Sequence, residues 1–152
     1  MINLTQSAVK PTEEIIRKTF DNINFNGIED LIEFYMISNG GVPDKNALSG
    51  DHNSTIRYFF PIQYRLPNNI ENIEETRIFY KSRKDISSFF IDNVPFSIDE
   101  GGNIHCLNVR DGCIYFVPMD NGSELEEEKI LVAVEFGDFI NKLDFFDKVF
   151  ID

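Results

Sequence analysis

The two histidines are the side chains of this sequence best suited to acid–base chemistry near neutral pH. His52 follows Asp51 and precedes Ser54 by two positions, whereas His105 lies in a separate apolar segment. Serine, histidine and aspartate can form a nucleophilic triad, which is defined by geometry rather than by spacing. Because no hydrolase signature surrounds Ser54, we interpret this segment as a solvated loop and expect no catalytic residue. A hydrolase that uses His52 remains the weakest alternative.

The two cysteines flank an Asp-Gly dipeptide, which is typical of a two-residue β-hairpin turn. In that register Cys113 opposes Arg110, and Cys106 opposes Val117. The two thiols then lie ~13 Å or more apart along the ladder, at ~3.4 Å per residue. A disulfide needs Cα atoms within about 7 Å, so we predict two free thiols, in keeping with a reducing compartment.

The same residues give no spacing typical of a zinc site. The sequence also contains no Walker loop, no dinucleotide fingerprint and no His-Glu-x-x-His motif. We therefore expect no metal, no cofactor and no enzymatic activity.

The excess of acidic side chains indicates which classes of binding partner this protein could have. The chain has 26 Asp and Glu against 14 Lys and Arg, for a net charge of −12. Nucleic acids and anionic membranes attract basic surfaces, so we expect neither as a partner, whereas a basic protein would be steered toward this chain. An acidic run is also typical of ordinary solvated surface. The candidate partner-binding residues are Asp99, Glu100, Asp111, Asp120, Glu124, Glu126, Glu127 and Glu128.

Helices are predicted near both ends of the chain. Thr12, followed by two glutamates, is typical of a helix N-terminus. Apolar residues at i, i+3, i+4 and i+7 predict a second helix over residues 28–38, and Asn26 and Glu29 have the spacing of a capping box. The Asn-Gly-Gly sequence at 39–41 can end this helix with a left-handed glycine cap. A last helical stripe runs from Phe136 to Leu143.

Strands are predicted between these helices. Residues 44–55 and the acidic segment 120–128 are predicted as loops, and 70–92 as mostly helix. Alternating apolar residues predict a strand over 56–64, which Pro61 confines to a sheet edge or breaks. Further strands are predicted over 94–98, 103–109, 113–118 and 130–134, and the last is apolar enough to be central.

The predicted hairpin of residues 103–118 has one core face and one face nearer solvent. Leu107 and Ile114 share the core face, and His105 alternates onto it as a partly buried, hydrogen-bonded side chain. Asn108 and Tyr115 share the other face. Helices at both ends of a run of antiparallel strands give an α+β fold: a single domain with a central, mostly antiparallel sheet flanked by helices.

Length and segment composition favour one domain. The 152 residues contain no linker or internal repeat, and we expect a flexible arm over 1–11 followed by one domain over 12–152. The first residues lack the basic and apolar regions of a signal peptide, and the longest aliphatic run, 130–134, is far shorter than the ~20 residues that span a bilayer. We expect a soluble, cytoplasmic protein.

Three motifs in order resemble the SUKH superfamily, which includes bacterial immunity proteins and fungal cell-wall assembly regulators. They are a helix ending in Asn-Gly-Gly, an apolar-Pro-Phe strand with an Asp-x-Gly-Gly-Asn turn and a following hairpin, and a C-terminal Phe-x-x-Phe helix. The resemblance covers roughly residues 12–145. Two features depart from the pattern: the chain has no Trp, and Val134 and Glu135 replace the polar residues that open the last helix. The residues that carry the family motifs are Asn39, Gly40, Gly41, Pro43, Pro95, Gly101, Gly102 and Leu107.

The resemblance implies an α+β fold and binding rather than catalysis. It implies an immunity protein that binds and neutralises a cognate toxin, often a nuclease, by occluding it. Since nucleases must attract phosphates and tend to be basic, the acidic charge fits such a partner. The alternative is a regulatory or scaffold module that binds an endogenous protein.

Overall fold

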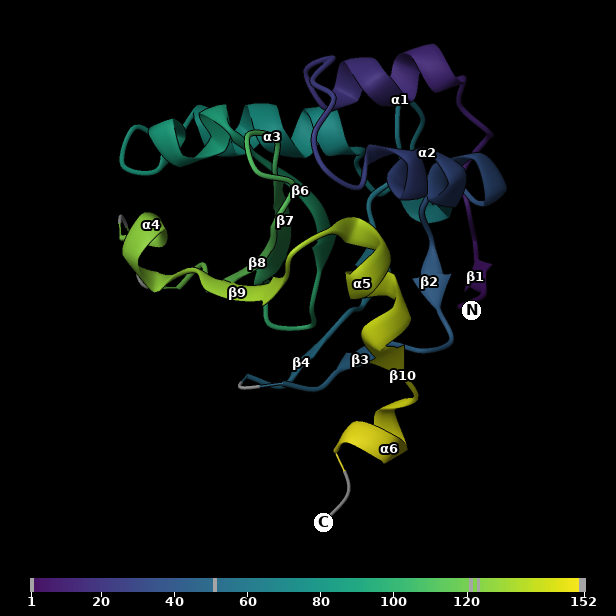
Figure 1. Cartoon of the computed structure of the whole chain (residues 1–152). Helices are drawn as coiled ribbons and strands as arrows, with labels where there is room; N and C mark the ends of the chain where they lie inside the picture. Colours follow the sequence, from purple (N-terminus) through teal and green to yellow (C-terminus); the bar gives the residue numbers. More distant parts are fainter. Residues whose placement is uncertain (1, 51, 121, 123, 151–152) are drawn as a thin grey trace.

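A five-stranded antiparallel sheet forms the centre of the computed structural model, which describes residues 2–50, 52–120, 122 and 124–150. Its strand order is β5-β6-β7-β8-β9, so strands that follow one another along the chain lie side by side (Figure 1). The strands are β5 (Tyr58–Phe59), β6 (Asn93–Ile98), β7 (Ile104–Asn108), β8 (Ile114–Val117) and β9 (Ile130–Ala133).

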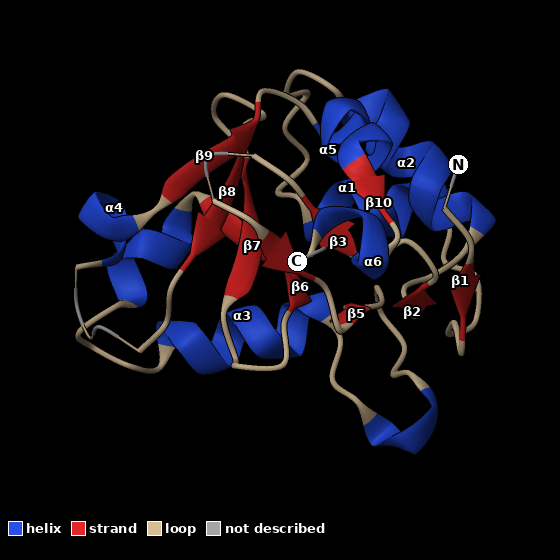
Figure 2. Ribbon diagram, turned by 90° about the horizontal axis from the view of Figure 1, so that it is seen from below, coloured by secondary structure: helices blue, strands red, loops and turns tan. Residues whose placement is uncertain are grey.

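Helices cover both faces of this sheet, which makes the fold α+β as predicted (Figure 2). One face packs against α1 (Glu13–Thr19), α2 (Ile28–Ile37) and α5 (Phe136–Lys142). The other packs against α3 (Ile73–Lys81), the 3-10 helix η2 (Ser87–Ile91) and α4 (Leu125–Glu128). The predictions of a helix capped by Thr12, of mostly helix over 70–92 and of a C-terminal helical stripe are confirmed.

Two small sheets and two short helices complete the described chain. The pair β1 (Leu4–Thr5) and β2 (Val42–Pro43) is antiparallel, and the division into an arm and a domain stays a prediction. A three-stranded sheet joins β3 (Ala47–Leu48), β4 (Ser54–Thr55) and β10 (Leu143–Asp144). The remaining elements are η1 (Pro67–Asn69) and α6 (Phe146–Val149).

Several sequence predictions of strands and loops were wrong in detail. Segment 44–55 is not only loop, because Ala47 and Leu48 are buried in β3. Of the strand predicted over 56–64, only β5 forms. It lies at the sheet edge and ends before Pro61, as the proline predicted. The strand over 130–134 is the opposite edge of the sheet rather than a central strand, and Leu131 is 54% exposed. Part of the acidic segment 120–128 forms α4.

The predicted register of the β7–β8 hairpin was wrong by two residues. Cys106 opposes Tyr115 rather than Val117, and the amide of Asn108 donates to the carbonyl of Cys113. The connection is therefore four residues long, which the Asp-Gly dipeptide by itself does not reveal. Because the shift is an even number of residues, each side chain keeps its predicted face.

The second face of the sheet is a second core, whereas the sequence predicted it to be the face nearer solvent. Ile104, Cys106 and Val117 are fully buried there, against Tyr80 and Phe90. These two rings stack with centroids 4.8 Å apart. The helical segment between β5 and β6 folds back over this face and removes it from water, and such a long-range packing is not visible in the strand pattern.

Candidate protein-binding surfaces

The buried polar centre of the molecule is His105 on β7. Its Nδ1 lies 2.9 Å from the hydroxyl of Ser97 on β6, and its Nε2 lies 3.2 Å from the hydroxyl of Ser54 on β4. The three side chains are 95% buried or more. A neutral imidazole offers one donor and one acceptor, so one serine accepts from the ring and the other donates to it. This arrangement holds the β3–β4 hairpin against the large sheet.

That contact gives Ser54 a structural role. Ser54 pairs with the buried His105, whereas the ring of His52 lies against Phe116 with centroids 4.5 Å apart. Asp51 lies outside the described residues. A substrate could not reach the buried Ser54 hydroxyl, so the serine–histidine contact is structural.

The fold should lose stability in acid through His105. Burial lowers the pKa of this imidazole to about 3, from an ordinary value near 6.5. Between these values the unfolded chain binds a proton that the folded chain rejects, so the stabilisation is complete above the ordinary pKa and is lost as the pH falls toward 3. The free energy of unfolding should fall by up to about 1.4 kcal/mol for each pH unit. Urea titrations from pH 7.5 to 4.5 should give a shallower slope for His105→Gln, and parallel curves would contradict this assignment.

Both cysteines are free, as predicted. Burial raises the pKa of the Cys106 thiol well above its usual range, and burial together with the Asp111 carboxylate raises the pKa of Cys113. Neither thiol is therefore poised to act as a thiolate nucleophile. Among the described residues no three His, Cys, Asp or Glu side chains gather as a metal site, and no helix of that part of the chain is long and apolar enough to cross a bilayer.

Most of the predicted partner-binding acids lie beyond the same end of β6, β7 and β8. Asp99 and Glu100 are in the β6–β7 turn, and the amide of Met119, just before Asp120, donates to Asn103 in that turn. The acids of α4 come next along the chain. Asp99 accepts bonds from the amides of Gly101 and Asn103, so its carboxylate builds the turn. The exposed acids are Glu100, Asp120, Glu124, Glu126, Glu127 and Glu128.

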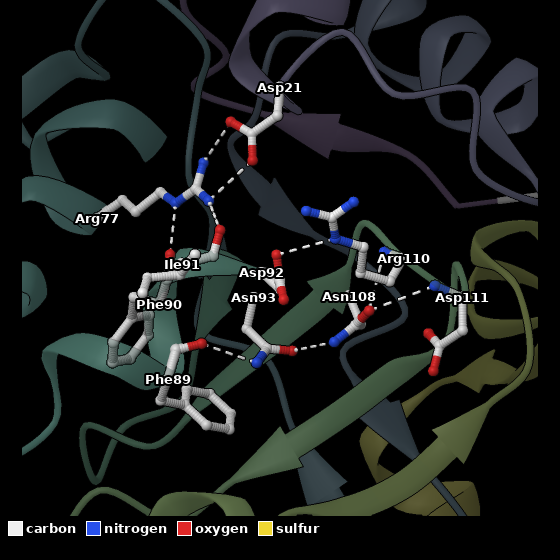
Figure 3. A network of polar contacts seen from close by, with 10 residues as sticks. All are labelled: Asp21, Arg77, Phe89, Phe90, Ile91, Asp92, Asn93, Asn108, Arg110 and Asp111. Atoms are coloured by element: carbon white, nitrogen blue, oxygen red, sulfur yellow. Dashed lines mark hydrogen bonds and ion pairs between the residues drawn. The ribbon is translucent and has the colours of Figure 1, made fainter.

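Asp111 lies at the opposite end of the hairpin, apart from those acids. Figure 3 shows it beside Arg110 and Asn108. It accepts from the amide of Cys113 and from the hydroxyl of Tyr115. Its neighbour Arg110 pairs with Asp92 at 3.1 Å, and Asn108 accepts from the amides of both Arg110 and Asp111. The structure thus divides the predicted acidic surface into two regions.

The residues that carry the family motifs lie in the core, in strands or in turns, where they support the fold. Asn39 is buried and hydrogen-bonded, and Leu107 is buried opposite Ile114. Pro43 ends β2, Pro95 precedes an irregularity of β6, and Gly101 and Gly102 form the β6–β7 turn.

The Asn-Gly-Gly motif is not a left-handed glycine cap, which corrects the sequence interpretation. Helix α2 ends at Ile37, and its C-cap residue, Ser38, has an extended backbone conformation. Gly40 has a φ of +70°, and a Cβ there would lie 2.8 Å from the carbonyl oxygen of Phe59. The glycines are therefore required by a close approach of two backbone segments. The predicted capping box of Asn26 and Glu29 is also absent, because Gly27 occupies the N-cap of α2.

An apolar groove of about 400 Å³ lies between α2, α5 and β1. This groove was not predicted from the sequence. Its lining includes Phe34 and Ile37, which do not belong to the row of buried residues on α2. A helix with apolar side chains outside its core-facing stripe is the sequence signal that could have indicated this surface.

Comparison with models of known protein families shows which family this chain belongs to. Residues 10–142 match the model of the SMI1 / KNR4 family (SUKH-1). The chain belongs to this family. The SUKH-1 match spans all three motifs that suggested it and includes the β6–β7 turn and the α2 and α5 walls of the groove, whereas Ile2 and Leu4 of the groove precede it. Members of the SUKH family are generally non-catalytic, which agrees with the enclosed position of Ser54 and His105. No curated protein and no solved structure matches the chain significantly.

Proposed function

We propose that this protein is an immunity protein that binds a basic toxin domain, of the nuclease type, and blocks it by occlusion. The observation that carries the proposal is the crowding of acids on and before α4. The Glu124 carboxylate lies within hydrogen-bonding reach of Glu127 and raises the pKa of that side chain. Like charges held together on an exposed surface oppose folding and favour a cationic partner.

The cations of this region do not balance its acids. Lys129 pairs with Glu126, and Arg57 pairs with Glu100 at 3.7 Å. Asp120, Glu124 and Glu127 add to the negative charge of the same end of the sheet. A toxin that binds nucleic acid carries basic residues in its active-site cleft, so an acidic protein surface can occupy that cleft without turnover. The family membership supports a protein-binding role of this kind.

Reversing the charges of α4 should slow association with the toxin. The variant Glu126→Lys/Glu127→Lys/Glu128→Lys removes electrostatic steering, and we expect the association rate constant at low salt to fall by about tenfold or more. The salt dependence should flatten as well. Stopped-flow fluorescence with the purified cognate toxin domain measures both quantities.

The matched control is Glu14→Lys/Glu71→Lys/Glu74→Lys, which changes the net charge equally on exposed residues of other elements. It should retain most of the wild-type rate, because steering depends on local charge near the contact. Equal rates for both variants would contradict the α4 contact. Failure of the wild-type protein to inhibit the toxin domain would contradict the immunity role itself.

A further inference from the structure

The α2–α5–β1 groove is a preformed apolar surface with a rigid floor. Phe34 forms part of this floor, and its ring meets Phe59 at 5.0 Å and Phe136 at 5.1 Å, in edge-to-face geometry. Phe59 and Phe136 are fully buried. A ring held by two buried aromatic neighbours has little freedom to collapse into the groove, so a ligand would find the cavity already shaped.

The walls of the groove are aliphatic and partly open to water. Ile2 and Leu4 come from the β1 side, Ile140 from α5 and Ile37 from α2. Ile37 is 64% exposed. A volume of about 400 Å³ fits two or three apolar side chains of a partner, and their burial would remove this exposed surface from water.

The rim of the groove carries two acids and no base among its lining residues. Asp30 and Glu33 lie three residues apart on α2, so they occupy the same helix face. Both are exposed, and neither takes part in an ion pair within the described part of the chain. Gly137 allows this arrangement, because a Cβ at that position would clash with the Asp30 carboxylate.

We infer that this groove docks an apolar segment of a protein partner that is flanked by Lys or Arg. The aromatic floor and aliphatic walls receive the apolar side chains, and the carboxylates of Asp30 and Glu33 pair with the cations. Fatty acids and phosphorylated ligands fit poorly, because their anionic heads would meet the acidic rim. A second copy of the chain fits poorly as well, since each copy carries a net charge of −12.

A random 12-residue peptide library displayed on phage and selected on the whole wild-type protein tests this inference. Selected sequences should combine aromatic or aliphatic residues with neighbouring Lys or Arg. The synthetic form of the most enriched peptide is then titrated by fluorescence anisotropy. Ile37→Gln should weaken its binding about tenfold by removing apolar contact. Asp30→Asn/Glu33→Gln should weaken it about fivefold at low salt and less at high salt.

The matched controls are Ile78→Gln on α3, where the isoleucine is 60% exposed, and Glu14→Gln/Glu74→Gln. Both should bind the peptide as the wild type does. The inference is overturned if no peptide is enriched, if the enriched peptides lack basic residues, or if Ile37→Gln binds unchanged. It rests on the proposed function only in requiring a protein partner, and its test uses neither the toxin nor α4, so the two can fail separately.

Discussion

Asn39→Ala should lower the free energy of unfolding by about 2–4 kcal/mol, because it leaves the buried amide of Ile62 without an acceptor and removes two further hydrogen bonds. The Asn39 amide nitrogen donates to the carbonyls of Val9 and Ile62, at 2.7 and 2.9 Å. Its oxygen accepts from the amide of Ile62 at 2.7 Å. One side chain therefore satisfies both backbone groups of Ile62, which is fully buried. Urea denaturation followed by circular dichroism measures the change.

Asn3→Ala is the matched control for this substitution. The Asn3 side chain donates to Asp44 at 3.3 Å on the exposed surface. Water can replace this bond, so we expect a loss below about 1 kcal/mol. If Asn39→Ala cost no more than Asn3→Ala, the buried bonds of Asn39 would not be important for stability. Asn39→Asp should be as harmful as the alanine variant, because a carboxylate cannot donate to either carbonyl.

Arg77→Met should lower the free energy of unfolding by a similar amount, about 2–4 kcal/mol, mainly because two carbonyls lose a charged donor. The guanidinium bonds both oxygens of Asp21, at 2.8 and 3.0 Å, and the carbonyls of Phe90 and Ile91, at 2.9 and 2.7 Å (Figure 3). Its side chain is 9% exposed. The substitution leaves one carboxylate and two carbonyls without their donor, and it detaches α3 from the segment between α1 and α2.

Two comparisons check this assignment. Arg83→Met removes an exposed pair with Asp85, 3.5 Å long, and should change stability by less than about 1 kcal/mol. A double-mutant cycle of Arg77→Met with Asp21→Asn should give a coupling energy of at least about 1 kcal/mol, because the two side chains bond each other directly. Additive effects in the cycle would contradict a direct role of Asp21.

The sequence by itself determined the order and type of most elements. The spacing of apolar residues predicted α2 and α5. Thr12 predicted the start of α1, where its hydroxyl accepts a hydrogen bond from the amide of Ile15. The β6–β7 and β7–β8 hairpins followed from alternation and from glycine-containing turns. These features depend on residues close together in the chain, and local periodicity and turn chemistry suffice to predict them.

Errors arose where a local pattern allowed two outcomes. The strand over 130–134 is as apolar as a central strand, yet β9 lies at the sheet edge. Cys106 lies on the hairpin face that was predicted nearer solvent, and it is fully buried because α3, η2 and α4 cover that face. Which face is covered depends on elements that come from elsewhere in the chain, and no strand pattern contains that information.

The tertiary structure alone decided what the polar side chains do. Asn39 bonds Ile62 across 23 residues, Ser54 meets His105 across 51, and Arg77 meets Asp21 across 56. The sequence predicted a helix end at Asn39, a solvated loop at Ser54 and no role for Arg77. Each side chain instead has its partner brought by folding from a distant segment, and water cannot replace the contact where both partners are buried. The same convergence of α2, α5 and β1 creates the groove, whose apolar walls come from all three elements and whose acids come from α2.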